Sequence, residues 1–191
     1  MQDPLPGGVS TSDPWRALLK LALYPDPVLV RPAAPIAEIT ETVREKAKAM
    51  VPFMELEGGI GLAAPQVSWG VRLLLASEEG TPEETRVLIN PEIVWKGGGT
   101  EWGEEGCLSF PGIFGDVLRA NQIRLKALDL DGAAQEIEAE GLFARVLQHE
   151  VDHLDGQLFF NKMRPADKLS NKGRIEDLIQ RFEARQQESK E

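Results

Sequence analysis

The segment HEVDH, residues 149–153, holds both histidines of the chain, four positions apart, with a glutamate directly after the first. Residues four apart on an α-helix lie one above the other, so the imidazoles of His149 and His153 can converge on one metal ion. Glu150 could then reach a water at that metal and act as a general base. The spacing predicts a metal-dependent hydrolytic site. The alternative is that both histidines are ordinary core or surface residues.

A catalytic metal site of this kind needs a third protein ligand and an open position for water. The chain has no third histidine, and LDGQLFFN after His153 lacks the extended three-histidine pattern of some metalloproteases. Its only cysteine, Cys107, lies between glycines in EEGCLSFPG, which is typical of a bent strand or loop. A lone cysteine is also commonly a small buried hydrophobic residue. Spacing alone does not place Cys107 beside the histidines.

A third segment, GGIGLAAPQ at residues 58–66, is rich in small residues that let a backbone come close to a ligand. Gln66 could present an amide N–H there. The same pattern is typical of a helix C-cap followed by a tight turn. It is not a phosphate-binding loop, because no Gly-Lys-Ser/Thr follows.

Helices and strands must position these segments. Apolar residues spaced three and four apart predict a helix over about 39–57, which a pair of glycines ends. A second helix is predicted over 142–154, where Leu142 and Val146 continue the stripe of the two histidines on a buried face. A third helix is predicted over 174–187, with apolar residues on one side.

Strands are predicted in the middle of the chain, at 71–76, 86–90 and 92–95, and the glycines at 97–99 predict a turn or bulge. The stretch 123–139 alternates apolar and polar residues on both sides of an Asp-Gly pair, which predicts a hairpin. Strands clustered between helices favour an α+β domain with an antiparallel sheet over a parallel one.

Composition excludes several classes of protein. The 191 residues are 42% hydrophobic and contain one cysteine, which excludes a disordered chain and a disulfide-stapled scaffold. The net charge of −10 argues against partners such as nucleic acid or an anionic membrane. No apolar run approaches the roughly 20 residues of a membrane span, and the first residues lack a signal-peptide pattern. We expect a cytoplasmic protein with a flexible arm at 1–20 and a single catalytic domain at 21–191.

Taken together, the three segments resemble the peptide deformylases, metal-dependent hydrolases that remove the formyl group from N-formylmethionyl nascent polypeptides. The family patterns GxGLAAxQ, EGCLS and QHExDHLxG stand here in the same order at residues 59–66, 105–109 and 148–156, without a mismatch. With YPDPVL, the hairpin and the C-terminal helix, the resemblance covers about residues 22–185. It implies an α+β fold in which antiparallel sheets wrap the histidine helix, with a further C-terminal helix.

The resemblance also implies the chemistry of the site. It makes Cys107, His149 and His153 the ligands of one divalent metal ion and Glu150 the catalytic acid and base. The active ion of the family is Fe2+, whereas a Cys/His/His set alone would normally indicate zinc. Because a thiolate beside ferrous iron is open to oxidation, we expect Zn, Ni or Co as substitutes in isolated protein.

The remaining roles concern the substrate. The resemblance implies that Gln66 and the backbone N–H of Leu108 stabilise the oxyanion, and that the backbone at Ile60 and Gly61 pairs with the formylated peptide as an added strand. Val146 lies one helical turn before the first histidine on the same face, so it is expected to form a wall of the pocket for the methionine side chain.

Two alternative functions remain at this point. A zinc endopeptidase of the HExxH type would cleave peptide bonds, take a third ligand from Glu or Asp, and not need Cys107. An inactive deformylase-like protein, or one that uses the metal only for structure, would need a fourth ligand or lack the glutamate, which is present.

The ribosome is a further candidate partner, because the C-terminal helix docks on it in some members of the family. Residues 163–191 carry seven Lys/Arg and six Asp/Glu and are therefore nearly neutral within an acidic chain. This balance permits docking near the nascent-chain exit, and an amphipathic helix folded on the core explains it equally well.

Overall fold

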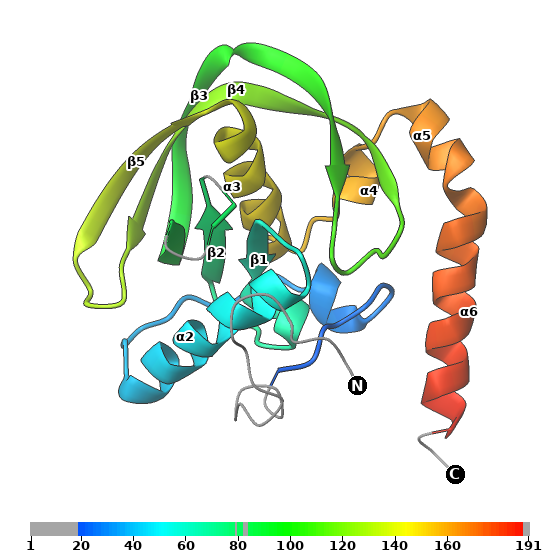
Figure 1. Ribbon diagram of the computed structural model, residues 1–191, viewed down its shortest axis with the longest axis horizontal. Helices are drawn as coiled ribbons and strands as arrows, with labels where there is room; N and C mark the ends of the chain where they lie inside the picture. The colour runs from blue at the N-terminus through cyan, green and yellow to red at the C-terminus, as the bar shows by residue number, and fades with distance from the viewer. Residues whose placement is uncertain (1–18, 79, 82–83, 189–191) are drawn as a thin grey trace, which may run out of the picture.

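A computed structural model describes residues 19–78, 80, 81 and 84–188, so most of the predicted N-terminal arm lies outside the described residues. The strands form one antiparallel sheet of five, in the order β1 to β5, and the sheet curves around a helix, α3 (Figure 1). The predicted α+β class is confirmed. Within the described ranges, no helix combines the length and the apolar character that crossing a membrane requires.

The elements have the following bounds. The strands are β1 Gly61–Ala63, β2 Leu73–Ser77, β3 Thr85–Gly106, β4 Phe114–Leu128 and β5 Ala134–Glu140. The α-helices are α2 Glu41–Leu56, α3 Gly141–Leu154, α4 Phe159–Lys162, α5 Pro165–Ser170 and α6 Lys172–Glu188, and the 3-10 helices are η1 Pro27–Val30 and η2 Ala64–Val67.

The three predicted helices are confirmed as α2, α3 and α6. Thr40 caps α2, because its side-chain oxygen accepts a hydrogen bond from the Val43 N–H at 3.4 Å. Gly58, just past the end of α2, has a φ of +73°, a conformation that glycine adopts without strain. The segment 58–66, for which a helix C-cap and a tight turn were one interpretation, continues into β1 and η2.

Strand β3 differs from the prediction of two short strands followed by a turn. It is one strand of 22 residues that runs antiparallel to β4, and Pro91 interrupts only its register. Register shifts between Ile89 and Glu92 and between Gly97 and Thr100 absorb the extra residues as bulges. The predicted break was therefore wrong, and the bulge is the correct alternative for the glycine run.

The predicted hairpin is confirmed. Ile123 pairs with Ala139 and Leu125 with Ile137, in the register that puts these four side chains on one face. Gly132 in the turn has a φ of +83°, which explains the glycine at this point of the hairpin.

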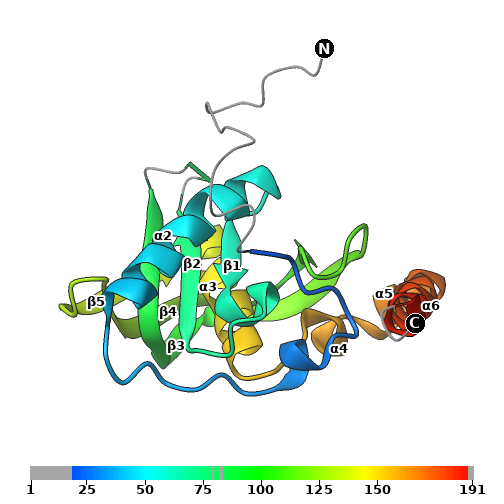
Figure 2. The ribbon, with the colours of Figure 1, turned by 90° about the horizontal axis from the view of Figure 1, so that it is seen from below.

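Strand β2 separates two hydrophobic cores. Leu74 and Ala76 pack in the cluster that includes the apolar residues of α3, whereas Leu73 and Leu75 pack in the cluster that includes those of α2. Because side chains alternate along a strand, α2 and α3 cover opposite faces of the sheet at β1 and β2 (Figure 2). Helix α3 thus packs against the concave face of the curved sheet, and ten of its fourteen residues are buried.

A third cluster holds the loop between β3 and β4. Phe110 is fully buried, stacks on Tyr24 with ring centroids 4.8 Å apart, and meets Phe159 edge-on. The same cluster takes Ile175 and Leu178 from α6, so only the first half of that helix contributes buried side chains to the body. This packing holds the end of β3 over α3.

Candidate metal centre

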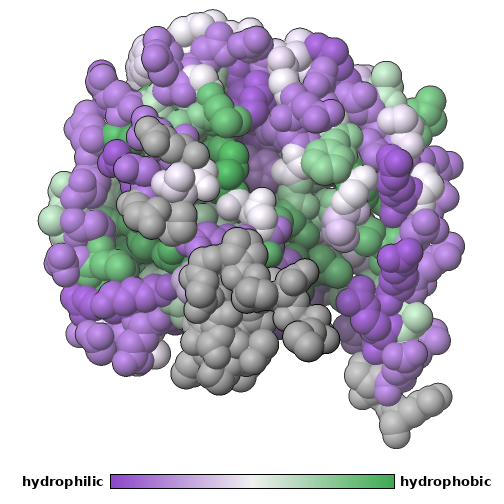
Figure 3. Space-filling model, viewed as in Figure 1, coloured by the Kyte–Doolittle hydropathy of each residue, from purple (hydrophilic) through white to green (hydrophobic). Residues whose placement is uncertain are grey.

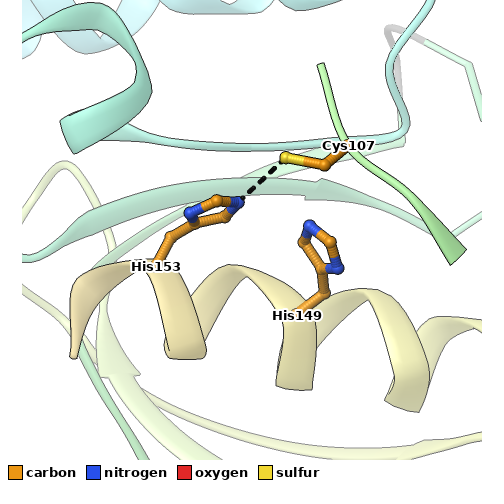
Figure 4. A group of neighbouring side chains, drawn as sticks. All are labelled: Cys107, His149 and His153. Atoms are coloured by element: carbon orange, nitrogen blue, oxygen red, sulfur yellow. Dashed lines mark hydrogen bonds between the residues drawn. The ribbon is translucent and has the colours of Figure 1, made fainter. Parts of the chain in front are cut away.

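The structure brings Cys107 together with His149 and His153 (Figure 4). One ligand atom from each lies within 4.8 Å of the others, and the Cys107 Sγ is 3.2 Å from the His153 Nε2. Both histidines project from α3, whereas the cysteine comes from the loop that follows β3. The prediction of adjacent histidines from helical spacing is confirmed, and the cysteine joins them from 42 to 46 positions away.

Backbone hydrogen bonds at Cys107 and just after it anchor the loop that follows β3. The backbone N–H of Phe110 donates to the carbonyl of Cys107 at 2.8 Å, and the N–H of Tyr24 donates to the carbonyl of Ser109 at 3.0 Å. With the Phe110 ring buried in the third cluster, these bonds hold the thiol in place. A Cβ built on Gly106 would overlap the Phe114 ring, whereas Gly112 has open space around it and a φ of +72°, which favours glycine.

A buried carboxylate orients the first histidine. The Nδ1 of His149 lies 2.9 Å from Glu105 Oε2, and Arg119 grips the same carboxylate at 2.8 and 2.9 Å. Burial raises the pKa of Glu105, but hydrogen bonds and positive charge from Arg119 and His149 outweigh it and hold that pKa well below its usual range. The anionic oxygen calls for a proton on Nδ1, which leaves Nε2 free to bind a metal.

A chain of ion pairs leads from Glu105 to the protein surface. Arg119 also pairs with Asp152, and Asp152 accepts from Lys162 Nζ at 2.6 Å. Burial lowers the pKa of Arg119, while the carboxylates of Glu105 and Asp152 raise it above its usual range. Lys162 is partly exposed, so this chain of ion pairs runs from the surface to the histidine.

Glu150 has a very different environment. It is 4% exposed, and its Oε2 is a buried atom with no hydrogen-bond partner among the described residues. Burial is the main cause that raises the pKa of Glu150 to about 7. Gly61 lies directly over this carboxylate, because a Cβ built on that glycine would overlap the Glu150 oxygen and crowd Val146. The close approach of the backbone therefore requires a glycine.

The two histidines differ in their charge. Burial alone would lower the pKa of both, but hydrogen bonds to Cys107 and Glu105 raise that of His149 to about 10. Burial and the positive charge of His149 hold the pKa of His153 well below its ordinary value. Because these groups bind a metal in their deprotonated form, metal binding here would release protons and depend on pH.

The oxyanion residues of the prediction lie next to the cysteine. Gln66 is 2% exposed, its Oε1 accepts from the Ala63 N–H at 2.8 Å, and its Nε2 is 3.3 Å from Ser109 Oγ and 3.5 Å from Cys107 Sγ. The amide is thus held with its N–H side toward the ligands. Leu108 follows the cysteine, and its side chain packs against Gly59.

A cavity of about 930 Å³ opens onto this centre. Its lining includes all the residues predicted to contact substrate: Ile60, Gly61, Gln66, Leu108 and Val146. Figure 3 shows hydrophobic atoms lining parts of the hollow in this face, with hydrophilic atoms along its upper and right-hand edges. A peptide can therefore enter this cavity from solvent and reach Cys107 and His149.

Leu142 contradicts the buried stripe predicted along α3. It lies in the first turn of the helix and lines the cavity, and its side chain is 62% exposed because the described residues leave it open to solvent there. The other predicted positions of the stripe, Val146 and the two histidines, are buried.

The edge of β1 is open toward the cavity. β1 is the first strand of the sheet and pairs with β2, with Gly61 opposite Ala76. The Ile60 carbonyl accepts from the Ser77 N–H at 2.8 Å, so the ladder with β2 begins just before the glycine. No strand within the described ranges pairs with the other edge of β1, where an extended chain could add.

Sequence reasoning missed the charged groups behind the ligands, Glu105, Arg119, Arg145 and Asp152. Two of them stand inside the motifs, since Glu105 begins EGCLS and Asp152 precedes the second histidine. Arg119 and Arg145 carry no such local signal, because their partners lie on other elements.

The residues present suit a divalent metal. Two imidazoles and one thiolate form a typical three-ligand set that leaves a fourth position for water. Glu150, whose buried Oε2 has no hydrogen-bond partner among the described residues, lines the same cavity as Cys107 and His149, and a water bound in that cavity could supply the missing hydrogen bond. The donor chemistry and the orphaned atom point to the same occupant.

Comparisons with known proteins agree with the motifs. Residues 18–169 match the family described as polypeptide deformylase. A curated peptide deformylase of Alkalilimnicola ehrlichii is 44% identical over 165 residues, which cover 85% of this chain and 92% of the relative. A solved structure of Arabidopsis thaliana peptide deformylase 1B with an inhibitor superposes with a TM-score of 0.84 at 36% identity, covering 87% of this chain and 93% of the other. A peptide deformylase structure from Legionella pneumophila gives a TM-score of 0.79 at 38% identity, with coverage of 87% and 98%.

Proposed function

Since the chain belongs to the polypeptide deformylase family, and so hydrolyses the N-terminal formyl group of N-formylmethionyl polypeptides with a divalent metal ion, we propose which of its residues carry out each step. The observation that carries the proposal is the meeting of Cys107 with His149 and His153, together with a buried Glu150 oxygen that has no hydrogen-bond partner among the described residues.

We assign the metal to the Cys107 Sγ and the free ring nitrogens of the two histidines. A divalent ion held there supplies a water of lowered pKa and polarises the formyl carbonyl. Glu105 orients the His149 ring by accepting from its Nδ1, which sets the direction of the other ring nitrogen. For the natural ion we propose Fe2+, in line with the resemblance of the three motifs, with Zn, Ni or Co as substitutes.

Glu150 is the proposed acid and base. Its carboxylate takes a proton from the attacking water and later gives it to the leaving amine of methionine. A pKa raised by burial to about 7 suits both roles, because the group can hold and release a proton near neutral pH.

Gln66 and Leu108 stabilise the charge that develops on the formyl oxygen. The Gln66 amide is fixed by Ala63 and Ser109, so its N–H need not reorganise during the reaction. The Leu108 backbone N–H lies one residue after the metal-binding cysteine and supplies the second donor. Removing one such donor typically lowers the rate about 10²–10³-fold.

The peptide is proposed to add to the open edge of β1. Backbone groups at Ile60 and Gly61 pair with it, which requires no particular side chains beyond the first. Val146 packs one turn from His149 and forms a wall for the methionine side chain. Because Gly61 has no side chain, the formyl group of the bound peptide can lie close to Glu150.

The decisive experiment measures formate release from formyl-Met-Ala-Ser by protein prepared without oxygen, with and without a chelator. Release that the chelator abolishes and added Fe2+ restores supports the proposal. No release from metal-loaded protein points instead to an inactive relative, and internal cleavage of an unformylated peptide points to an endopeptidase. Metal analysis of the same anaerobic preparation tests the choice of iron.

The cysteine separates the two enzymatic alternatives. Cys107→Ala should lose most of its bound metal, measured per chain after gel filtration, because a catalytic site with two remaining ligands holds the ion weakly. An endopeptidase that uses a carboxylate as third ligand would keep its metal. Stoichiometric metal in Cys107→Ala would remove the cysteine from the ligand set.

We further propose that residues 21–191 act as one catalytic unit in the bacterial cytoplasm and that the ribosome is a partner. The second half of α6 is exposed from Arg181 onward, apart from the partly buried Phe182, and leaves a helical surface available near the nascent-chain exit. Cosedimentation of the full chain with ribosomes tests this, and a chain that stays in the supernatant would contradict it.

A further inference from the structure

A second arginine holds the carboxylate that orients His149, and the reaction as described above gives it no role. Arg145 Nη1 donates to Glu105 Oε1 at 2.9 Å and to the Val117 carbonyl at 2.8 Å. A longer contact of 3.3 Å reaches the Gly103 carbonyl, and Nη2 donates to the Glu101 carbonyl at 3.0 Å. The side chain is 13% exposed, so the guanidinium is largely enclosed by these partners.

Strand β3 has a notch for this guanidinium. A Cβ built on Gly103 would lie 2.7 Å from Arg145 Nη2 and 2.9 Å from the guanidinium carbon. The φ of Gly103 is not in the left-handed region, so the backbone conformation does not call for glycine there. Space for the arginine is the physical reason for a glycine at this position.

The two arginines come from different elements, Arg119 from β4 and Arg145 from α3, and both donate to Glu105 Oε1. Arg119 is backed by Asp152 and, through it, by Lys162, away from the cavity. Arg145 instead lines the cavity that takes the substrate. Together with His149 they fill the acceptor capacity of the carboxylate, whose two oxygens accept four contacts of 2.8–2.9 Å.

We propose that Arg145 is a positioning residue for the metal centre, which fixes Glu105 and through it the His149 ring, and that Gly103 is the notch that admits it. The inference rests on the proposed assignment of His149 as a metal ligand. Arg119 donates to both oxygens of Glu105, and Arg145 adds a second donor to Oε1, so the two arginines together fix the carboxylate. Loss of Arg145 therefore loosens the ring that presents Nε2.

The competing explanation is purely structural, because Arg145 also ties α3 to the carbonyls of β3 and β4. A structural tie would change the stability of the fold and leave the affinity for metal unchanged. A positioning role acts on the metal through Glu105, so its effect must depend on that carboxylate. The two roles thus differ in a quantity that does not require activity.

The experiment measures the dissociation constant of Co2+ by competition between the loaded protein and a chelator, together with the visible absorption of bound Co2+. Arg145→Met is expected to weaken the affinity about tenfold, at the lower end of the effect of removing groups that hold metal-binding histidines. Arg145→Lys keeps the positive charge and should retain part of the Co2+ affinity. The matched control, Arg124→Met, removes an arginine from an exposed position on β4 and should leave the Co2+ affinity unchanged. Gly103→Ala tests the notch without removing the arginine and should weaken affinity by a smaller factor.

A double-mutant cycle with Glu105→Gln shows whether Arg145 acts through the carboxylate. In the protein that already carries Glu105→Gln, Arg145→Met should weaken Co2+ binding much less than it does alone. An equal effect in both backgrounds, or an unchanged affinity with a lower melting temperature, would overturn the inference. His149→Ala separates this from the proposed function: if it too leaves affinity unchanged, the ligand assignment fails, whereas if it alone weakens binding, only the role of Arg145 fails.

Discussion

Two buried carboxylates, Glu105 and Glu150, lie close to the histidines of α3, and their surroundings are opposite. Glu105 is 6% exposed and Glu150 is 4% exposed, so burial alone would treat them alike. Glu105 accepts from two arginines and a histidine, and its pKa is held well below the usual range. Glu150 has one oxygen without a partner among the described residues, and its pKa rises to about 7.

Under the proposed assignment, this difference separates the positioning of a ligand from proton transfer within one site. A carboxylate whose lone pairs are all used stays ionised and fixed, so it can orient a ligand but cannot take a proton near pH 7. A carboxylate left short of partners keeps a proton affinity that the reaction can use. The motif EGCLS supplies the carboxylate with all its lone pairs used, and HEVDH supplies the one that lacks a partner.

The largest effect should come from removing the carboxylate with unused capacity. Glu150→Ala is expected to lower kcat by at least 10²–10⁴-fold, because proton transfer loses its acid and base. The metal content per chain should stay unchanged, since the three ligands remain. Glu150→Gln keeps the size of the side chain and serves as the matched variant. Formate release near the wild-type rate in either protein would contradict the role of Glu150.

The next effect comes from the glycine that faces this carboxylate. In Gly61→Ala the new methyl group must displace the Glu150 oxygen or Val146, and a misplacement of about 1 Å can cost roughly 10²-fold in rate. Metal binding should persist. Gly70→Ala is the control, because a Cβ there meets nothing within 4 Å. Equal activity of Gly61→Ala and Gly70→Ala would show that the close approach is dispensable.

Changing the saturated carboxylate should act on the metal more than on proton transfer. Glu105→Gln is expected to weaken metal affinity by about 10–100-fold, because the proton on His149 Nδ1 loses its anionic acceptor. Chelator competition measures the affinity, and kcat is compared at saturating metal. If kcat at full metal occupancy falls as far as in Glu150→Ala, the two carboxylates do not divide the work as proposed.

The smallest expected effect is a shift along the pH axis. Glu150 must be ionised to accept a proton, so kcat/KM should fall as pH drops below the pKa of this group. Burial raises that pKa to about 7, and the charge of a bound cation opposes the rise. The acid limb should therefore lie above the ordinary 4.5 and no higher than about 7. An acid limb at or below 4.5, measured at constant metal occupancy, would contradict the raised pKa.

Local patterns account for much of the fold. Three- and four-residue spacing predicts α2, α3 and α6, and alternation predicts the hairpin of β4 and β5, because both depend on which side of an element faces the core. The 22 residues of β3 escape this reasoning. Proline and glycines interrupt its alternation, and it stays one strand because it pairs with β2 over residues 85–89 and with β4 from Ile89 onward. The first half of β4 also escapes prediction from local patterns, because it depends on the same pairing with β3.

The sequence by itself determined that His149, Glu150 and His153 share a helix face, because helical geometry relates residues three and four apart without help from the rest of the chain. The order of the three motifs also determined the family, and with it the reaction. Leu142 shows where this reasoning ends: it belongs to the same stripe and is nevertheless exposed, since burial depends on what packs over a residue.

Only the tertiary structure decided what surrounds that helix face. Cys107 reaches the histidines because the third hydrophobic cluster holds the end of β3 over α3. Glu105 is saturated because arginines from β4 and α3 converge on it, whereas Glu150 is left with Gly61 above it. The charge state of a carboxylate is set by neighbours distant in the chain, and no local pattern of residues records which neighbours those are.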